Sequence, residues 1–218
     1  MKKTLIALTF ALLASHSQAA TVLGLELGAA AWQATLDSPD DNTLKTDKDT
    51  SGVAWLAFEH PLPVLPNIRL SHNAMRHDVR QSLAGSGELD SSFTDATLYY
   101  EVLDNWLSLD LGITGRRYQG ESVSGNEDID SSLGLLYAGA RFALPLTGLA
   151  IGVEINYDDI GLNGGESVRD GQLFLQYKTG FGFGVMAGYR DNRSDIRVGK
   201  TIRELALDGG FAGLFWRF

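Results

Sequence analysis

The chain has 218 residues, no cysteine, and 27 acidic against 18 basic residues, so its formal net charge is −9. The missing cysteines exclude a disulfide framework, thiolate chemistry and a lipoprotein anchor, and the acidic balance argues against a nucleic-acid partner. Glycine is abundant, at 25 residues, and helical periodicity is weak, which together favour an all-β fold.

The first residues have the three parts of a secretory signal peptide. Lys2 and Lys3 supply a positive start, residues 5–14 are apolar but too few to span a bilayer as a helix, and Ser17 and Ala19 place small residues before a cleavage point. We therefore expect residues 1–19 to be a cleaved signal peptide and residues 20–218 to be the mature domain. An uncleaved N-terminal anchor is the alternative. Cleavage would leave 16 basic against 27 acidic residues, a formal charge of −11.

The mature sequence alternates between apolar and polar side chains with a period of two, which is typical of β-strands. It predicts ten strands, in residues 23–36, 52–60, from 67, 93–102, 106–117, 132–144, 149–158, 168–178, from about 181, and a last one ending at 218. No apolar run after the signal peptide reaches the ~20 residues of a transmembrane helix, whereas ~9–11 residues suffice for a tilted membrane strand. Only helices and closed barrels satisfy the backbone in lipid, so a membrane location requires a barrel.

The connections between the predicted strands alternate between short and long. The short ones are residues 61–66, 103–105, 145–148 and 178–180, and the long polar ones are residues 37–51, 76–92, 118–131, 159–168 and 191–204. Outer-membrane barrels have short periplasmic turns and long extracellular loops. The pattern predicts a single antiparallel transmembrane β-barrel of ten strands with both termini in the periplasm. Eight or twelve strands, and a secreted soluble β-sandwich, are the alternatives.

Aromatic residues gather near both ends of the predicted strands, as in the two belts that amphipathic rings form at lipid headgroups. Near the short connections these are Phe58, Tyr100, Trp106, Phe142, Phe183, Trp216 and Phe218, and near the long ones Trp32, Phe93, Tyr118, Tyr157 and Tyr189.

The last predicted strand carries an apolar stripe. Ala212, Leu214, Trp216 and Phe218 share one parity, and Arg217 has the other. This stripe resembles the C-terminal signature of Gram-negative outer-membrane proteins, which the barrel-assembly machinery reads. The resemblance makes Leu214, Trp216 and Phe218 the assembly signal.

With its signal peptide and ten strands, the whole mature chain resembles a small proteobacterial outer-membrane β-barrel. It is similar to an uncharacterised outer-membrane protein family named for a Gly-Gly motif. Gly209-Gly210, expected at the start of the last strand, and Gly164-Gly165 are the candidates for that motif. The resemblance implies a location in the cell outer membrane and contact with outer-membrane lipid, lipopolysaccharide and the assembly machinery. It implies no known activity.

The other face of the predicted strands, which a barrel turns inward, carries charges of both signs that should pair, because an unpaired buried charge is very costly. The predicted lumen charge network consists of Glu26, Arg69, Glu101, Asp110, Arg141, Glu154, Lys178 and Arg190, with Asp95 and Arg116 on the same face. Ten strands leave little space once side chains point inward. A salt-bridged plug is therefore the main expectation, and a small or gated pore is the alternative.

The histidines match neither of two catalytic arrangements found in outer-membrane barrel enzymes. The ten-stranded outer-membrane proteases use paired aspartates with an Asp-x-His pair, and the lipid hydrolases of this membrane use His-x-Ser. Neither pattern occurs at His60, His72 or His77. Ser71 and His72 are adjacent, so on a strand they face opposite sides and cannot act as nucleophile and base.

We expect no catalytic, cofactor-binding or metal site. The acidic clusters at residues 40–41 and 127–130 match no calcium loop and are interpreted as solvated surface. The expected function is that of a structural or passive-pore barrel with a largely side-chain-filled lumen. The alternative within the membrane is a barrel enzyme acting on lipid or peptide, for which His77 is the best candidate residue.

Overall fold

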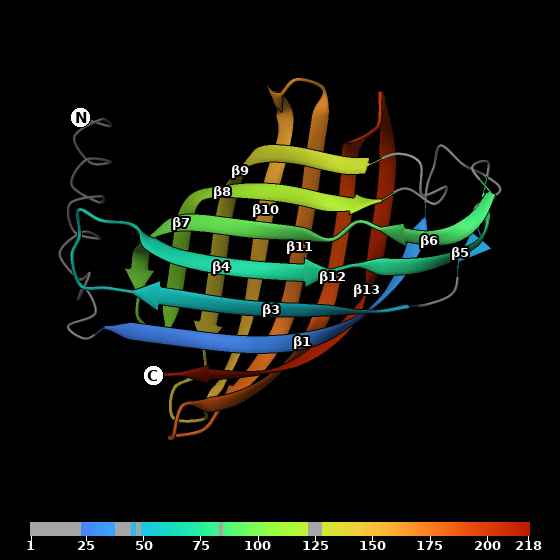
Figure 1. The fold of residues 1–218 in the computed structure, drawn as a ribbon. Coiled ribbons are helices and arrows are strands. Elements are labelled where there is room, and N and C mark those ends of the chain that lie inside the picture. The colour runs from blue at the N-terminus through green and yellow to red at the C-terminus, as the bar shows by residue number, and fades with distance from the viewer. Residues whose placement is uncertain (1–22, 38–44, 47–48, 83–84, 122–127) are drawn as a thin grey trace, which may run out of the picture.

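Ten long strands form one closed antiparallel barrel (Figure 1). The structure is a computed structural model that describes residues 23–37, 45–46, 49–82, 85–121 and 128–218. The strands are β1 (Gly24–Asp37), β3 (Asp49–Glu59), β4 (Asn67–Ala74), β7 (Phe93–Asp104), β8 (Leu107–Glu121), β9 (Asp128–Ala143), β10 (Leu149–Asn163), β11 (Glu166–Lys178), β12 (Phe183–Val198) and β13 (Thr201–Arg217). Strand β13 pairs back onto β1, and β8 pairs with β9, so the ring is closed. The prediction of ten strands is confirmed, and the sandwich is excluded.

The ring closes between the first and the last strand. Their register runs from Glu26 opposite Arg217 to Asp37 opposite Ala206. Beyond it, the N–H of Phe218 donates to the carbonyl of Leu25 at 2.8 Å, and the N–H of Leu25 donates back at 3.1 Å. A closed ladder of this kind is what a bilayer requires, since lipid offers no partner to an open sheet edge.

Three shorter strands lie beyond the ring. Strand β5 (Arg76–Ser82) follows β4 after Met75, and β6 (Gly85–Asp90) leads into β7, so these two extend one hairpin of the barrel. Strand β2 (Lys45–Thr46) pairs with β5, and Asp90 of β6 pairs with Glu121 of β8. Within the part of the chain that the structure describes, no helix is long and apolar enough to cross a membrane.

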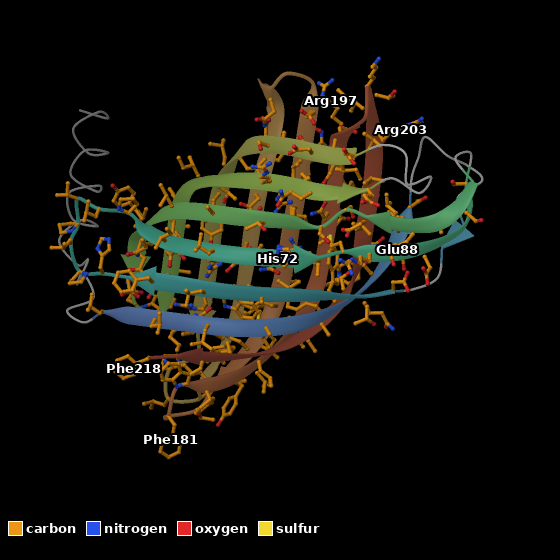
Figure 2. All side chains as sticks on the ribbon, viewed as in Figure 1. His72, Glu88, Phe181, Arg197, Arg203 and Phe218 are labelled. Atoms are coloured by element: carbon orange, nitrogen blue, oxygen red, sulfur yellow. The ribbon has the colours of Figure 1, made fainter. Side chains whose placement is uncertain are left out.

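The two ends of the barrel differ in their connections. At one end, called the short-turn end, β3–β4, β7–β8, β9–β10 and β11–β12 are joined by short segments. At the other, called the hairpin end, β10 connects to β11, β12 connects to β13, and β5 and β6 extend the connection between β4 and β7. Figure 2 shows Phe181 and Phe218 at the short-turn end, and Glu88, Arg197 and Arg203 at the hairpin end.

Three of the expected long loops are wrong. Residues 76–92 consist mostly of the strands β5 and β6. Residues 159–168 and 191–204 are mostly strand, because β10 and β11 meet at Gly164-Gly165 and β12 and β13 meet next to Gly199. All three glycines have positive φ, at 66°, 101° and 59°, which permits tight hairpin turns that other residues disfavour. The polar residues of these segments favour a loop, but apolar residues alternate with them as in a strand.

The position of Gly209-Gly210 is also corrected. Strand β13 begins at Thr201, so this pair lies midway along it rather than at its start. A Cβ at Gly209 would lie 2.0 Å from the backbone oxygen of Gln33. The glycine therefore allows β13 to lie close against β1.

At one level along the strands, the outer face of the barrel wall changes from apolar to polar, and the inner face changes from polar to apolar. On β8, Leu109, Leu111 and Ile113 face outward on the short-turn side of this level. On the hairpin side, the outward residue is the exposed Arg117, and the inward residue Tyr118 is buried. Strand β8 thus changes from apolar outside to apolar inside within a few residues.

Strand β12 repeats this change. Val185 and Tyr189 face outward on the short-turn side, whereas Arg193 and Arg197 face outward on the hairpin side with Ile196 buried behind them. An apolar outer band flanked by polar surface is the signature of a strand that crosses a bilayer. The short-turn half of the barrel is therefore its membrane-spanning part, and the hairpin half has water outside and an apolar interior.

The aromatic belts are confirmed in part. At the short-turn end, Trp106 meets Phe142 edge-on at 5.3 Å, and Trp216 stacks on Phe218 at 5.8 Å between ring centroids. Near the hairpin half, Tyr157 and Tyr189 face outward as expected. The belt assignment of Trp32, Phe93 and Tyr118 is wrong, since all three are buried inside the barrel.

Leu111→Arg should destabilise the barrel by about 2–4 kcal/mol, because it places a charge on the lipid face near the bilayer centre. The matched control is Gln119→Arg, on the same strand and face but on the hairpin side of the polarity change, which should cost about 0–1 kcal/mol. Urea unfolding in phospholipid vesicles, followed by the gel mobility of the folded form, measures both. Equal losses at the two positions would contradict the assignment of the membrane-spanning half.

Candidate functional site

A chain of charged residues crosses the lumen at the level where the wall changes polarity. Arg116 donates to Asp95 through Nε and Nη2, both at 2.8 Å, and through the same Nη2 to Asp170 at 2.6 Å. Arg190 donates to both oxygens of Asp170, at 2.8 and 2.7 Å, and to Oδ1 of Asn73 at 2.7 Å. These five residues, called the crossing cluster, come from β8, β7, β11, β12 and β4 and so join opposite walls of the ring.

The crossing cluster is buried and balanced in charge. Arg116 is 1% exposed and Asp170 is 4% exposed. Two guanidinium groups face two carboxylates, and each makes a two-point contact with one of them, the strongest geometry for such pairs. The cations also lie over aromatic rings, Arg116 at 3.7 Å from the centroid of Phe93 and Arg190 at 4.8 Å from Trp32. Such pairing is what allows charges to remain in a low-dielectric interior.

Apolar side chains fill the lumen on the hairpin side of the crossing cluster. This set, called the apolar plug, includes Trp32, Leu36, Phe93, Tyr118, Leu133, Leu135, Val168, Ile196, Val198, Leu205 and Leu207. Its polar atoms are satisfied locally, as when the Tyr118 hydroxyl hydrogen-bonds to the Ser194 hydroxyl at 2.9 Å. The crossing cluster and the apolar plug together occupy the lumen over the hairpin half.

The lumen keeps a cavity of about 120 Å³ on the short-turn side of the crossing cluster. The lining extends from Asp95 and Arg190 of the cluster to Glu59 and Arg217, the last residues of β3 and β13 at the short-turn end. A space of this size holds several water molecules. The barrel interior is therefore a pocket that opens toward the short turns and ends at the crossing cluster.

Two further ion pairs brace this pocket. Arg69 of β4 donates to Glu154 of β10 at 2.9 Å, across the lumen, and Gln172 donates to the second oxygen of Glu154 at 2.7 Å. Glu26 accepts from the indole N–H of Trp55 at 2.8 Å, and Arg217 forms an ion pair with the same carboxylate.

The structure divides the predicted lumen network into three groups. Arg190 lies in the crossing cluster together with Asp95 and Arg116, and Glu26, Arg69 and Glu154 belong to the ion pairs below it. The remaining four are Glu101, Asp110, Arg141 and Lys178, whose side chains form neither an ion pair nor a hydrogen bond with a residue that the structure describes.

Sequence reasoning missed Asp170 and Arg217. Asp170 has the same parity as Gln172 and Phe174 on β11, so extending that strand's alternation by one step would have placed it inside. Arg217 was assigned to the face opposite the aromatic stripe but was not connected to Glu26. Their register partners, Asn156 and Glu26, were not known from the sequence.

Inward glycines receive the aromatic rings of the next strand. A Cβ at Gly28 would lie 2.2 Å from the ring of Trp55, one at Gly152 would lie 2.5 Å from Phe174, and one at Gly184 would lie 2.2 Å from Phe215. The rings consequently lie flat against the wall instead of crossing the lumen, which leaves the cavity open. Gly182, by contrast, has a φ of 88° and serves the β11–β12 turn.

The histidines lie apart from the pocket. His60 is at the β3–β4 turn, where its ring nitrogen lies 3.2 Å from the carbonyl of Pro66, and His72 faces outward from β4 (Figure 2). His77 is fully buried in the β5–β6 extension, and neither of its ring nitrogens has a hydrogen-bond partner among the described residues.

The predicted acidic clusters lie at the surface or outside the described chain. Residues 40–41 and 127 are outside the described residues, as are residues 1–19 of the expected signal peptide. Asp128 and Asp130 face outward from β9, and Asp130 accepts from the exposed Arg117 at 3.5 Å. Among the side chains that the structure describes, no group of three or more metal-binding residues gathers.

An apolar outer band on a closed backbone ladder defines a membrane-spanning β-barrel. Among solved structures, the chain is similar to the outer membrane protease OmpT from Escherichia coli, with 12% identity over 91% of this chain and 94% of that one, at a TM-score of 0.46. It is also similar to the translocator domain of the autotransporter NalP from Neisseria meningitidis, with 12% identity over 100% and 96%, at a TM-score of 0.36.

No protein-family model matches the chain, and no curated protein matches it in sequence. The resemblance to the family named for a Gly-Gly motif therefore stays a prediction.

Arg116→Met should destabilise the barrel by about 3–5 kcal/mol, because it leaves the buried carboxylate of Asp95 without its cation. Arg117→Met is the matched control: the neighbouring arginine faces outward, and its exposed contact with Asp130 should contribute less than about 1 kcal/mol. Urea unfolding of the two refolded variants measures the difference. Similar unfolding midpoints would show that the crossing cluster does not stabilise the barrel.

The β5–β6 extension should lose stability as the pH falls. Burial lowers the pKa of His77 from its ordinary value of 6.5, against the opposing effect of the Asp49 carboxylate. The unfolded segment therefore binds a proton more readily than the folded one, so the stability is complete above that ordinary value and is lost at more acidic pH. Hydrogen exchange of the β5 and β6 amides, corrected for intrinsic rates, should show falling protection from about pH 8 to about pH 5. His77→Leu should abolish the trend and His72→Leu should keep it; constant protection in the unaltered protein would contradict this.

Proposed function

We propose that this protein is an integral barrel of the cell outer membrane with a structural role, whose lumen is closed to solutes by its own side chains. The observation that carries the proposal is the crossing cluster with the apolar plug behind it. Arg116 and Asp170 link β8 to β11, and Arg190 links β11 to β4, so bonded side chains bridge the lumen at one level. A solute crossing the barrel would have to break these pairs and then enter an apolar interior, both of which are costly.

The proposed orientation places the short turns in the periplasm and the hairpins outside the cell. Short periplasmic turns and longer outer segments are the rule for barrels of this membrane. Charged side chains project outward just beyond the apolar band, as Arg193 and Asp191 do on β12. We expect this rim to contact the phosphates of lipopolysaccharide.

We further propose how the protein is exported and assembled. Residues 1–19 act as a cleaved signal peptide, and the barrel-assembly machinery recognises the outward stripe of β13. Leu214 and Phe218 in this stripe are 67% and 74% exposed, and the indole of Trp216 stacks on Phe218. Before the barrel inserts into the membrane, a receptor can contact these exposed side chains. After insertion they face lipid.

The refolded barrel should give no discrete conductance steps in a planar bilayer, because the crossing cluster and the apolar plug interrupt the aqueous path. Insertion is verified independently by protease protection and by the heat-modifiable gel mobility of a folded barrel. Regular single-channel steps from correctly inserted protein would overturn the closed-lumen proposal.

The cysteine-free chain offers a matched control for the same prediction. Gln176→Cys, in the wall of the cavity, should react with a water-soluble thiol reagent. Leu135→Cys, in the apolar plug, should not react until the barrel is unfolded.

A further inference from the structure

We propose that the pocket at the short-turn end binds a small zwitterion, a molecule with one ammonium and one carboxylate group, such as a free amino acid. The binding groups are Asp110 of β8 and Tyr137 and Arg141 of β9, which line the cavity, and Glu101 of β7, which lies opposite Asp110 next to that lining. This inference goes beyond the closed structural barrel: a closed lumen does not require a ligand, and a ligand in this pocket does not require passage across the membrane.

Two carboxylates face each other in this part of the wall, and neither is ion-paired with a cation that the structure describes. Glu101 and Asp110 are directly opposite in the β7–β8 register. Like charges in that position repel. Within the described residues, neither carboxylate forms an ion pair, and Oδ1 of Asp110 is buried without a hydrogen-bond partner. An ammonium group placed between them would relieve the repulsion and satisfy the free oxygen.

A hydroxyl group lies beside these carboxylates and also lacks a partner. Tyr137 is 5% exposed, and its buried hydroxyl oxygen forms no hydrogen bond with a described residue. Gly139, opposite Asp110 in the β8–β9 register, brings the two groups together. A Cβ at this glycine would lie 2.8 Å from the Tyr137 hydroxyl and 3.5 Å from Oδ2 of Asp110. The Tyr137 hydroxyl thus lies over the bare glycine next to the Asp110 carboxylate, so one ligand group could meet both side chains.

The complementary cation comes from the same strand. Arg141 lies two residues after Gly139 on β9, faces inward and lines the same cavity as Asp110 and Tyr137. Unlike Arg69 and Arg217, which are paired with Glu154 and Glu26, Arg141 forms no ion pair within the described part of the chain. A guanidinium group offers two parallel donors to a carboxylate, so Arg141 is the group that would hold the carboxylate end.

The remaining walls of the pocket suit an apolar side chain. Trp55, Phe174 and Phe215 line the cavity with their rings held flat over inward glycines. The pocket therefore combines a negative pair, a cation and an apolar wall, which is the chemistry that recognises an amino acid with a hydrocarbon side chain.

Isothermal titration of the refolded full-length mature barrel in detergent micelles tests the proposal, with glycine and leucine as probes. We expect saturable heat, with leucine binding more tightly than glycine because of the apolar wall. N-acetylleucine, which lacks the ammonium group, and leucine methyl ester, which lacks the carboxylate, should each bind about tenfold or more weakly, as expected for the loss of one charge-assisted contact.

Variants assign each end of the ligand. Arg141→Met should weaken leucine about tenfold or more and leave the methyl ester unchanged, whereas Asp110→Asn should weaken leucine and leave N-acetylleucine unchanged. Tyr137→Phe removes only the free hydroxyl and should weaken leucine, and Lys178→Met, at the exposed rim, is the control that should have no effect.

Folding of every variant is checked by gel mobility, so a loss of binding is separated from a loss of structure. Absence of saturable heat from both amino acids would mean that these groups hydrogen-bond only to water and would overturn the site. Equal binding of leucine and its two blocked forms would overturn the zwitterion assignment. Both results are independent of the conductance measurement, which tests the closed lumen.

Discussion

The constraint on which the rest of this structure depends is the change of solvent along the strands. The half of the wall near the short turns faces lipid, so its outward positions are apolar and its polar side chains can only point inward. The other half faces water, and there the outward positions carry arginine and aspartate while the interior is apolar. A single strand such as β8 serves both halves by exchanging the roles of its two faces between Ile113 and Tyr118. Backbone closure through β1 and β13 is common to both halves, and the lipid-facing half depends on it because lipid offers no partner to an unpaired edge.

This constraint produces three layers inside the barrel. Inward polar groups of the membrane-spanning half line the cavity, and inward apolar groups of the hairpin half form the apolar plug. The crossing cluster lies where these two interiors meet. Its charges are too buried to be solvated and are compensated by each other, as Asp170 is by both Arg116 and Arg190. One ten-stranded barrel thus combines a polar cavity, a level of paired charges and an apolar plug.

The sequence predicted which residues face outward and inward better than it predicted the side-chain contacts inside the lumen. Alternation alone placed Leu109, Leu111 and Ile113 outside and Asp110 inside, because a period of two fixes the face of every residue once the strand is known. It did not predict the contact of Arg69 with Glu154, since strands β4 and β10 become neighbours across the lumen only when the strand number and stagger are fixed. Trp32, Phe93 and Tyr118 were assigned to a lipid belt because aromatic residues near strand ends look alike in sequence whether they face lipid or a core. Their parity, shared with Glu26, Asp95 and Arg116, already indicated the interior.

Tight turns at glycine are the second reason why the structure differs from the sequence-based prediction. Charged segments read as flexible loops because polarity is the usual sign of a connection, yet Gly164-Gly165 and Gly199 allow the neighbouring strands to continue to their ends. A hairpin end made of paired strand carries far fewer free backbone groups than a set of loops of the same length would.

The bonds that cross the lumen also have a mechanical consequence. A ring of strands held only at its wall can flatten into an ellipse with little change in its backbone hydrogen bonds, because each strand pair needs to bend only slightly. Bonds from Arg116 to Asp170, from Arg190 to Asn73 and from Arg69 to Glu154 run between walls that are well separated around the ring. These bonds fix several diameters of the ring, at the level of the crossing cluster and at the level of the Arg69–Glu154 pair. The lateral pressure of the surrounding bilayer is therefore borne by the interior as well as by the wall, and the cross-section keeps one shape.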